Sequence, residues 1–286
     1  MKIINNQNIK LYNPETKNFL ADAYYPETEN KIPLVILVHG YKGYKDWGCW
    51  NLMAERFAEA GFYFVKFNFS HNGTTVENPD EFADLEAFGN NNYSKELSDL
   101  SFVIDYFSNE SKVDKNKIVL IGHSRGGGIS IVKTAEDSRI QGLITLASVD
   151  SLERFPKNEA LENWKKEGVY FVENGRTRQQ MPHYYQFFED YENNLHRLDV
   201  ERSMEMAKAH VLVVHGSSDE SVLPKNADHL HLLNPNSELF LVENANHTFG
   251  AKEPWEETSM PYDLALVTEK CIDFINKKIV NEDIVK

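Results

Sequence analysis

Cysteine is scarce in this sequence, with two residues among 286. Cys49 and Cys271 are far apart, and neither belongs to a group of Cys, His, Asp or Glu with the spacing of a metal site. A disulfide framework and a zinc motif are therefore excluded. We predict two ordinary reduced thiols, no metal and no cofactor.

Long hydrophobic runs are also missing. No stretch reaches the roughly 18 consecutive apolar residues that a membrane-spanning helix needs. Residues 1–13 are polar and lack the apolar segment of a secretory signal. The sequence therefore predicts a cytoplasmic protein with no membrane contact.

Positively charged residues are also few relative to negatively charged ones. The chain has 30 Lys and Arg against 44 Asp and Glu, which gives a formal net charge of −14. Such a chain repels nucleic acid and anionic membranes, so neither partner is expected. Internal repeats and low-complexity segments are absent, and the sequence leaves the oligomeric state open.

Strand-like and helix-like segments alternate along the chain. Apolar runs typical of strands covered on both faces lie at 33–38, 62–69, 142–147, 211–214 and 239–242. Helical patterns lie at 50–60, 94–109, 224–233 and 261–278, and a strand, a turn and a helix follow one another across 118–137. This order predicts an α/β fold with a mostly parallel sheet and helices on both faces, preceded by one or two antiparallel edge strands within residues 1–32.

Residues 151–208 interrupt this rhythm. We interpret 1–150 and 209–286 as the core and 151–208 as an aromatic-rich cap or lid insertion. Within it we expect a helix at 159–166, a hairpin that starts at 169–172 and turns at Asn174-Gly175, and helices near 183–195 and 199–208. Residues 70–93 form a second unusual segment, a long loop of the kind that is functional or mobile.

The segment 117–128, KIVLIGHSRGGG, contains G-x-S-x-G between a predicted strand and a predicted helix. On such a sharp turn Ser124 would expose its hydroxyl as a nucleophile. The alternative is a glycine-rich turn with a surface serine. The functional interpretation requires an acid and then a histidine further along the chain.

Both partners are present in the required order. Asp219 follows the apolar run 211–214, and His247 follows the run 239–242. The imidazole would take the serine proton, and the carboxylate would orient the imidazole. A loop-capping aspartate and an ordinary loop histidine are the alternatives, and Asp150 and Glu220 are rival acids.

Two backbone N–H groups are candidates for stabilising the oxyanion. Arg125 directly follows the serine, and Tyr41 follows His39-Gly40 after the first core strand. We interpret His39 as structural, holding that loop in shape.

Candidate pocket residues are fewer. His71, His183 and Tyr184 are predicted to border the substrate pocket. Arg176 and Arg178 could contact an acidic group of the substrate, or they could belong to a solvated basic face. The aromatic residues of the insertion could bind an apolar or aromatic acyl group, or only pack the insertion onto the core.

Four segments together resemble the α/β-hydrolase superfamily: HGYKG, GHSRG, HGSSDESV and NANHTF. They are similar to its oxyanion, elbow, acid and histidine loops, and the resemblance covers roughly residues 17–278. Within the superfamily the chain resembles small bacterial carboxylesterases of the cinnamoyl or feruloyl type, related dienelactone hydrolases, and the catalytic domain of prolyl-oligopeptidase-like enzymes. Dienelactone hydrolases proper use a cysteine where this chain has Ser124.

This resemblance implies a serine carboxylesterase that cleaves a small-molecule ester through an acyl-enzyme on Ser124. A peptidase or an acyl-thioesterase of the same fold is the alternative within the hydrolases. A ligand-binding protein without turnover is the alternative outside them.

Overall fold

The computed structural model describes residues 2–281, and these residues form a central eight-stranded sheet with the order β1-β2-β4-β3-β5-β6-β9-β10. The strands are β1 (Ile3–Leu11), β2 (Phe19–Pro26), β3 (Ile32–Val38), β4 (Tyr63–Phe67), β5 (Val113–His123), β6 (Ile140–Leu146), β9 (His210–Gly216) and β10 (Glu238–Val242). The β1–β2 and β2–β4 pairs are antiparallel, and all the others are parallel. Only β1 of the two N-terminal strands lies at an edge.

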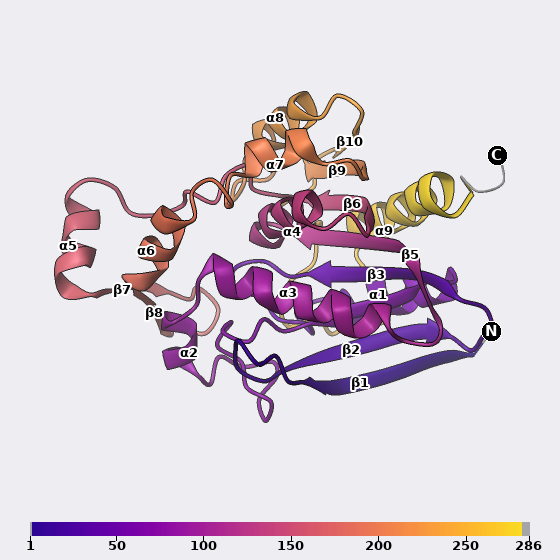
Figure 1. The fold of residues 1–286 in the computed structure, drawn as a ribbon, viewed down its shortest axis with the longest axis horizontal. Coiled ribbons are helices and arrows are strands. Elements are labelled where there is room, and N and C mark those ends of the chain that lie inside the picture. The colour runs from indigo at the N-terminus through magenta and orange to yellow at the C-terminus, as the bar shows by residue number, and fades with distance from the viewer. Residues whose placement is uncertain (1, 282–286) are drawn as a thin grey trace.

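Helices cover both faces of the sheet (Figure 1). Successive side chains of a strand point to opposite faces, so Leu34 and Ile36 of β3 enter one core while Val35 and Leu37 enter the other. The first core also contains α3 (Tyr93–Ser108), α4 (Arg125–Glu136), α7 (Val200–Met206) and α8 (Lys225–Leu233). The second contains α1 (Trp50–Glu59) and α9 (Tyr262–Ile275), which continues into the π-helical segment η1 (Asn276–Val280). The predicted fold class is confirmed.

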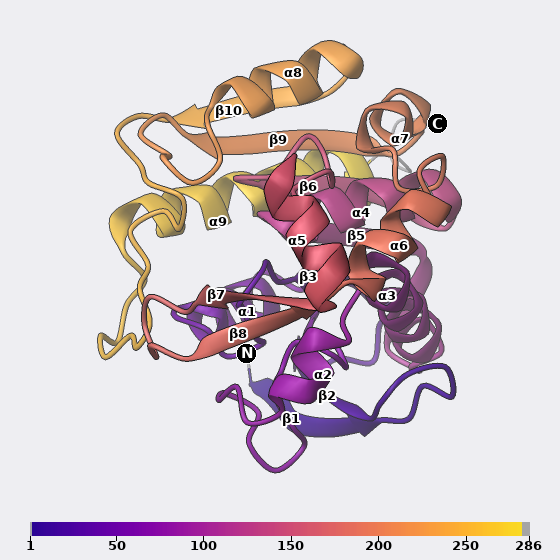
Figure 2. The ribbon, with the colours of Figure 1, turned by 90° about the vertical axis from the view of Figure 1, so that its left-hand side faces the viewer.

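Most of the predicted insertion lies beyond the carboxyl ends of the parallel strands (Figure 1, Figure 2). It contains α5 (Glu159–Glu167), the hairpin of β7 (Val169–Glu173) and β8 (Gln180–Tyr184), and α6 (Gln186–Asn193). Figure 2 shows α5 and the hairpin in front of the ends of the sheet. The last helix before β9, α7, packs instead against α4 and α8 of the core. No helix within residues 2–281 combines the length and apolarity that crossing a membrane requires.

Three local predictions were wrong. The hairpin does not turn at Asn174-Gly175, since residues 174–179 connect its strands and Arg178, rather than Gly175, has a positive φ of 61°. The Asn174 Oδ1 accepts hydrogen bonds from the N–H groups of Arg176 and Thr177, which stabilises this longer loop. His183 and Tyr184 pair with β7 instead of starting a helix. The loop 70–93 contains a short helix, α2 (Leu85–Gly89), capped by Asp84.

Candidate active site

Ser124 occupies a strained turn between β5 and α4. Its φ of 56° and ψ of −120° are unusual for a residue with a side chain. The turn is tight because Gly122 and Gly126 leave no room for a Cβ, which would lie 2.4 Å from Gly126 O and 2.3 Å from Val38 O, respectively. This is the backbone geometry that the G-x-S-x-G pattern predicts.

Asp219 and His247 are brought together by the loops that follow β9 and β10. The His247 Nδ1 lies 2.7 Å from the Asp219 Oδ2. The Asp219 Oδ1 accepts hydrogen bonds from the backbone N–H groups of Ser221 and Val222, at 2.8 and 2.9 Å. The carboxylate is thereby held in one orientation, and its contact with Nδ1 leaves the Nε2 of the imidazole for another partner.

His215 is a second histidine on the same carboxylate, and it is not among the site residues predicted from the sequence. Its Nε2 lies 2.8 Å from Val222 O and 3.2 Å from the Asp219 Oδ2. Burial raises the pKa of Asp219, but hydrogen bonds from His215, His247 and the backbone outweigh burial and hold it below its ordinary value. Asp219 is therefore an anion at neutral pH. The His-x-x-x-Asp spacing in HGSSD was the only sequence signal for this contact.

The rival acids lie elsewhere. The Asp150 Oδ2 is 2.9 Å from the His229 Nδ1, and its Oδ1 accepts a hydrogen bond from Asn226. Glu220 is exposed. Asp219 is therefore the acid that contacts the predicted base.

Ser124 and His247 line the same two cavities. Among the described residues no hydrogen bond joins the serine hydroxyl to the imidazole. Such contacts are often longer without substrate and shorten in the Michaelis complex. The geometry thus provides a hydroxyl, an imidazole and a carboxylate at one site.

The segment after β3 contacts the turn at Ser124. A Cβ on Gly40 would lie 3.0 Å from the Ser124 Cβ. His39 is buried, with its Nδ1 2.9 Å from Gly40 O, and its Nε2 accepts a hydrogen bond from Phe69 N–H. Both ring nitrogens are therefore engaged in holding this segment. As the first residue of α4, Arg125 has a backbone N–H with no acceptor within the helix.

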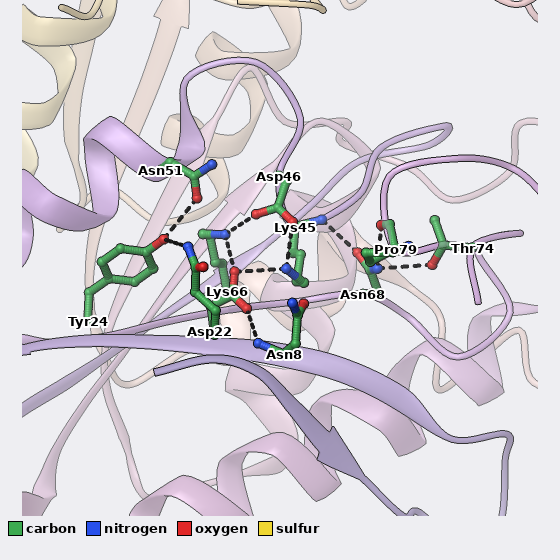
Figure 3. Close-up of polar contacts among 11 residues, drawn as sticks. Asn8, Asp22, Tyr24, Lys45, Asp46, Asn51, Lys66, Asn68, Thr74 and Pro79 are labelled. Atoms are coloured by element: carbon green, nitrogen blue, oxygen red, sulfur yellow. Dashed lines mark hydrogen bonds and ion pairs between the residues drawn. The ribbon is translucent and has the colours of Figure 1, made fainter. Parts of the chain in front are cut away.

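An ionic network also holds the segment after β3 (Figure 3). Lys45 lies after Tyr41, and its Nζ is 2.9 Å from the Asp22 Oδ2 and 2.5 Å from the Asp46 Oδ2. Lys66 of β4 contacts the same two carboxylates. Two strands and the segment after β3 are thereby joined through the buried charges of Asp22, Lys45 and Lys66 and the partly exposed Asp46.

The larger of the two cavities, which we call the aromatic cavity, has a volume of about 440 Å³. Besides Ser124 and His247 it is lined by Tyr41, Tyr93, Arg125, Val149, Arg154, Phe155, Tyr170, Val172, His183, Phe187, Ser221 and Val222. The guanidinium of Arg125 lies 4.8 Å from the centre of the Tyr41 ring and pairs with the buried Glu96 at 2.8 Å. Burial raises the pKa of Glu96, while Arg125 opposes this. No sequence pattern pointed to Glu96.

His183 is one of the three predicted pocket residues, and it lines the aromatic cavity. Its Nε2 is 2.7 Å from the Tyr41 hydroxyl, and its ring stacks on Tyr170. Burial lowers the pKa of His183 to about 3, so the ring is neutral. His71 and Tyr184 line neither cavity: His71 is buried beside Ser70, and the Tyr184 hydroxyl contacts Glu86.

The other cavity, which we call the cationic cavity, has a volume of about 420 Å³. Its lining comes from the segment after β3, from α1, from the hairpin loop and from residues 247–253. These residues are His39, Gly40, Tyr41, Lys42, Gly43, Trp47, Trp50, His123, Ser124, Asn174, Arg176, His247, Thr248, Ala251, Lys252 and Glu253. The two cavities therefore share Tyr41, Ser124 and His247.

Within residues 2–281 no three His, Cys, Asp or Glu side chains are grouped in a way that could hold a metal ion. Cys49 and Cys271 are buried and unpaired by disulfide.

Comparison with known families gives a match over residues 52–262 to the prolyl oligopeptidase family. Among curated proteins, the quorum-quenching protein AidA of Acinetobacter baumannii is 28% identical over 44% of this chain and 38% of its own length. Cutinase 2 of Thermobifida cellulosilytica is 26% identical over 43% of this chain and 42% of its own length. The chain thus spans about two fifths of the length of these curated relatives.

Solved structures match over nearly the whole chain. Est1E from Butyrivibrio proteoclasticus, with ferulic acid bound, has a TM-score of 0.73 and 20% identity, covering 95% of this chain and 99% of that chain. The α/β hydrolase GrgF from Penicillium sp. sh18 has a TM-score of 0.70 and 14% identity, covering 98% and 100%. These likenesses confirm the α/β-hydrolase fold.

Proposed function

Because the chain belongs to the prolyl oligopeptidase family and has the α/β-hydrolase fold, we propose that it is a serine hydrolase that cleaves carboxylic esters through an acyl-enzyme on Ser124. The observation that carries this proposal is the Asp219–His247 hydrogen bond at the two cavities where the strained Ser124 also lies. A non-catalytic binding protein would have no need of this combination.

In the proposed mechanism the Ser124 hydroxyl gives its proton to the His247 Nε2 while Oγ attacks the ester carbonyl carbon. The tetrahedral intermediate collapses as the bond to the alcohol oxygen breaks, and the imidazolium returns the proton to the alcohol. A water molecule, deprotonated by the same imidazole, then cleaves the acyl-enzyme to the acid. Asp219 stabilises the imidazolium throughout.

The negative charge of the intermediate would be stabilised by the backbone N–H groups of Tyr41 and Arg125. The approach of Gly40 to the Ser124 Cβ supports this role, since it brings the Tyr41 segment beside the nucleophile. Each such donor is worth on the order of 100- to 1000-fold in rate.

Covalent labelling provides the first test. A fluorophosphonate probe should label the wild-type protein at Ser124, and the protein should hydrolyse a short p-nitrophenyl ester. Ser124→Ala should abolish both labelling and turnover while preserving the thermal unfolding transition. Unchanged turnover in this variant would overturn the proposal.

The aromatic cavity favours an aromatic acyl group and supports the cinnamoyl or feruloyl type of esterase. Three of its rings pack edge to face, those of Tyr93, Phe155 and Phe187, and the ring centres of Tyr93 and Phe187 are 4.7 Å apart. Turnover of methyl ferulate should exceed that of a butyrate ester. Equal or lower turnover would remove this subgroup from consideration.

Peptide bond cleavage is the second candidate, favoured by the family match over residues 52–262. It predicts turnover of short chromogenic peptides that is lost in Ser124→Ala. The same protein preparation should be assayed with the ester and the peptide, because the ratio of the two kcat/KM values separates the candidates.

A further inference from the structure

The charges around Ser124 have the opposite sign to those of the whole protein. The chain has a net charge of −14. The cationic cavity is nevertheless lined by Lys42, Arg176 and Lys252, with Glu253 as its single carboxylate. The aromatic cavity adds Arg154 and also Arg125, which pairs with Glu96 outside the lining. Cations therefore gather at the nucleophile of an acidic protein.

The one carboxylate of the cationic cavity is already engaged. The Glu253 Oε2 accepts a hydrogen bond from the Gly48 N–H at 2.5 Å. Among the described residues, no carboxylate lies within ion-pair distance of Lys42, Arg176 or Lys252. The half-buried Lys42 donates to the carbonyl of Glu173 at 2.9 Å. Three cations against one carboxylate therefore leave the lining of this cavity with a net positive charge.

The hairpin loop, residues 174–179, places Arg176 and Arg178 in different surroundings. Asn174 is buried, and its Oδ1 accepts a hydrogen bond from the Arg176 N–H at 3.0 Å, which fixes the backbone where Arg176 reaches the cavity. Arg176 lies over the Tyr44 ring, 5.9 Å from its centre. Arg178 lies outside the cavity and pairs with Glu173 at 2.7 Å. Of the two arginines, only Arg176 therefore lines the cavity that contains Ser124.

We propose that the cationic cavity binds an anionic group of the substrate, a carboxylate, sulfate or phosphate, on the half of the ester that enters it. This inference rests on the proposed function of Ser124 as the nucleophile. It identifies the substrate class as an acidic ester, with Arg176 and Lys252 as specificity-determining residues.

The physical basis is the contrast between the cavity and the rest of the surface. A concave site lined by one sign of charge concentrates field lines and raises the local concentration of ligands of the opposite charge. The net charge of −14 disfavours an anion over the surface as a whole, so the contrast favours binding in this cavity. A guanidinium also gives paired, charge-assisted hydrogen bonds to carboxylate or phosphate oxygens.

The test uses esters matched in shape but not in charge. In the first pair, 4-carboxyphenyl acetate carries a negative charge in its alcohol half, and its carboxamide is the neutral counterpart. In the second pair, mono-4-nitrophenyl succinate carries the charge in its acyl half, and 4-nitrophenyl butyrate is the neutral counterpart. For one of these pairs, the kcat/KM ratio of anionic to neutral ester should fall about fivefold in Arg176→Gln and about tenfold in Arg176→Gln/Lys252→Gln. The wild-type ratio should also fall as salt is added. Sulfate and phosphate in place of the carboxylate identify the preferred anion.

Arg178→Gln is the matched control, because it removes the same charge from the same loop outside the cavity. It should leave every ratio unchanged. Equal ratios in the wild type, Arg176→Gln and Arg178→Gln for both pairs would overturn the inference while leaving the ester hydrolase proposal intact.

Calorimetry of the esters binding to Ser124→Ala, which does not cleave them, tests the opposite case, in which the anion site exists but the protein is not an ester hydrolase. In that case Ser124→Ala binds the anionic ester preferentially, Arg176→Gln/Ser124→Ala loses this preference, and the wild type shows no turnover. This result would support the anion site and overturn the proposed function. Equal affinities for the anionic and neutral esters of both pairs would contradict the anion site.

Discussion

At the scale of single residues, the Asp219 carboxylate connects two histidines and two backbone N–H groups. Asparagine would keep its shape but would place an N–H₂ donor beside one of these partners. If that donor faces the His247 Nδ1, the imidazole must hold its proton on Nε2 and cannot accept one from Ser124. We expect Asp219→Asn to lower kcat by about 10⁴-fold with a smaller effect on KM.

Steady-state kinetics on a p-nitrophenyl ester measures this effect, and Asp150→Asn is its control. Asp150 also follows a core strand, but it pairs with His229 outside both cavities. Its variant should keep the wild-type kcat. A large loss in Asp150→Asn together with a small one in Asp219→Asn would reverse the assignment of the acid.

The order of Ser124, Asp219 and His247 could be predicted from the sequence, because each follows an apolar run and parallel strands end at the same edge of the sheet. The contacts of His215 and Glu96 could not. Each depends on how side chains from different elements pack, and sequence spacing does not encode that. Likewise, the choice between Arg176 and Arg178 depends on the conformation of residues 174–179, and the Asn-Gly pair suggested the wrong turn.

At the scale of elements, the buried ionic network joins β2, β4 and the segment that carries Tyr41. Lys66→Met would leave the carboxylates of Asp22 and Asp46 with one lysine instead of two. Removing one partner from a buried ion pair costs about 3–5 kcal/mol, since the remaining charge is not compensated. We therefore expect a loss of this size in the free energy of unfolding, measured by urea denaturation.

Lys112→Met is the matched control, because Lys112 pairs with a fully exposed Glu29 carboxylate. Such surface pairs contribute about 0–1 kcal/mol. Lys66→Met should in addition lower kcat more than it raises KM, since a less firmly held Tyr41 N–H acts mainly on the transition state. Similar losses of stability in both variants would show that the network has no special role.

Some elements could be predicted from sequence patterns and others could not. The apolar runs specify β3 to β10 of the main sheet well, because a strand buried on both faces has few polar positions. The helix α2 was not predicted, since its five residues lie in a polar loop and its cap, Asp84, becomes meaningful only with the structure. The lysines of the ionic network also gave no signal, because a buried charge and an exposed one look alike in a sequence.

At the scale of the whole molecule, buried histidines should make the fold sensitive to mild acid. Burial lowers the pKa of His39 and His71 to about 4 and that of His123 and His183 to about 3. In the unfolded chain these groups titrate near the ordinary value of 6.5. Below that pH the unfolded state therefore binds more protons than the folded state, and the folded state loses stability as the pH falls toward 4.

Asp99 acts in the opposite direction, because burial raises its pKa to about 6 and the folded state takes up that proton first. The histidines outnumber it, so the free energy of unfolding should fall by roughly 2–4 kcal/mol per pH unit around pH 5. Urea denaturation at several pH values between 7 and 5 measures this slope. His71→Gln, which lies outside both cavities, should reduce it by about 1.4 kcal/mol per pH unit. A free energy of unfolding that stays constant over this range would contradict the buried, neutral state of these four rings.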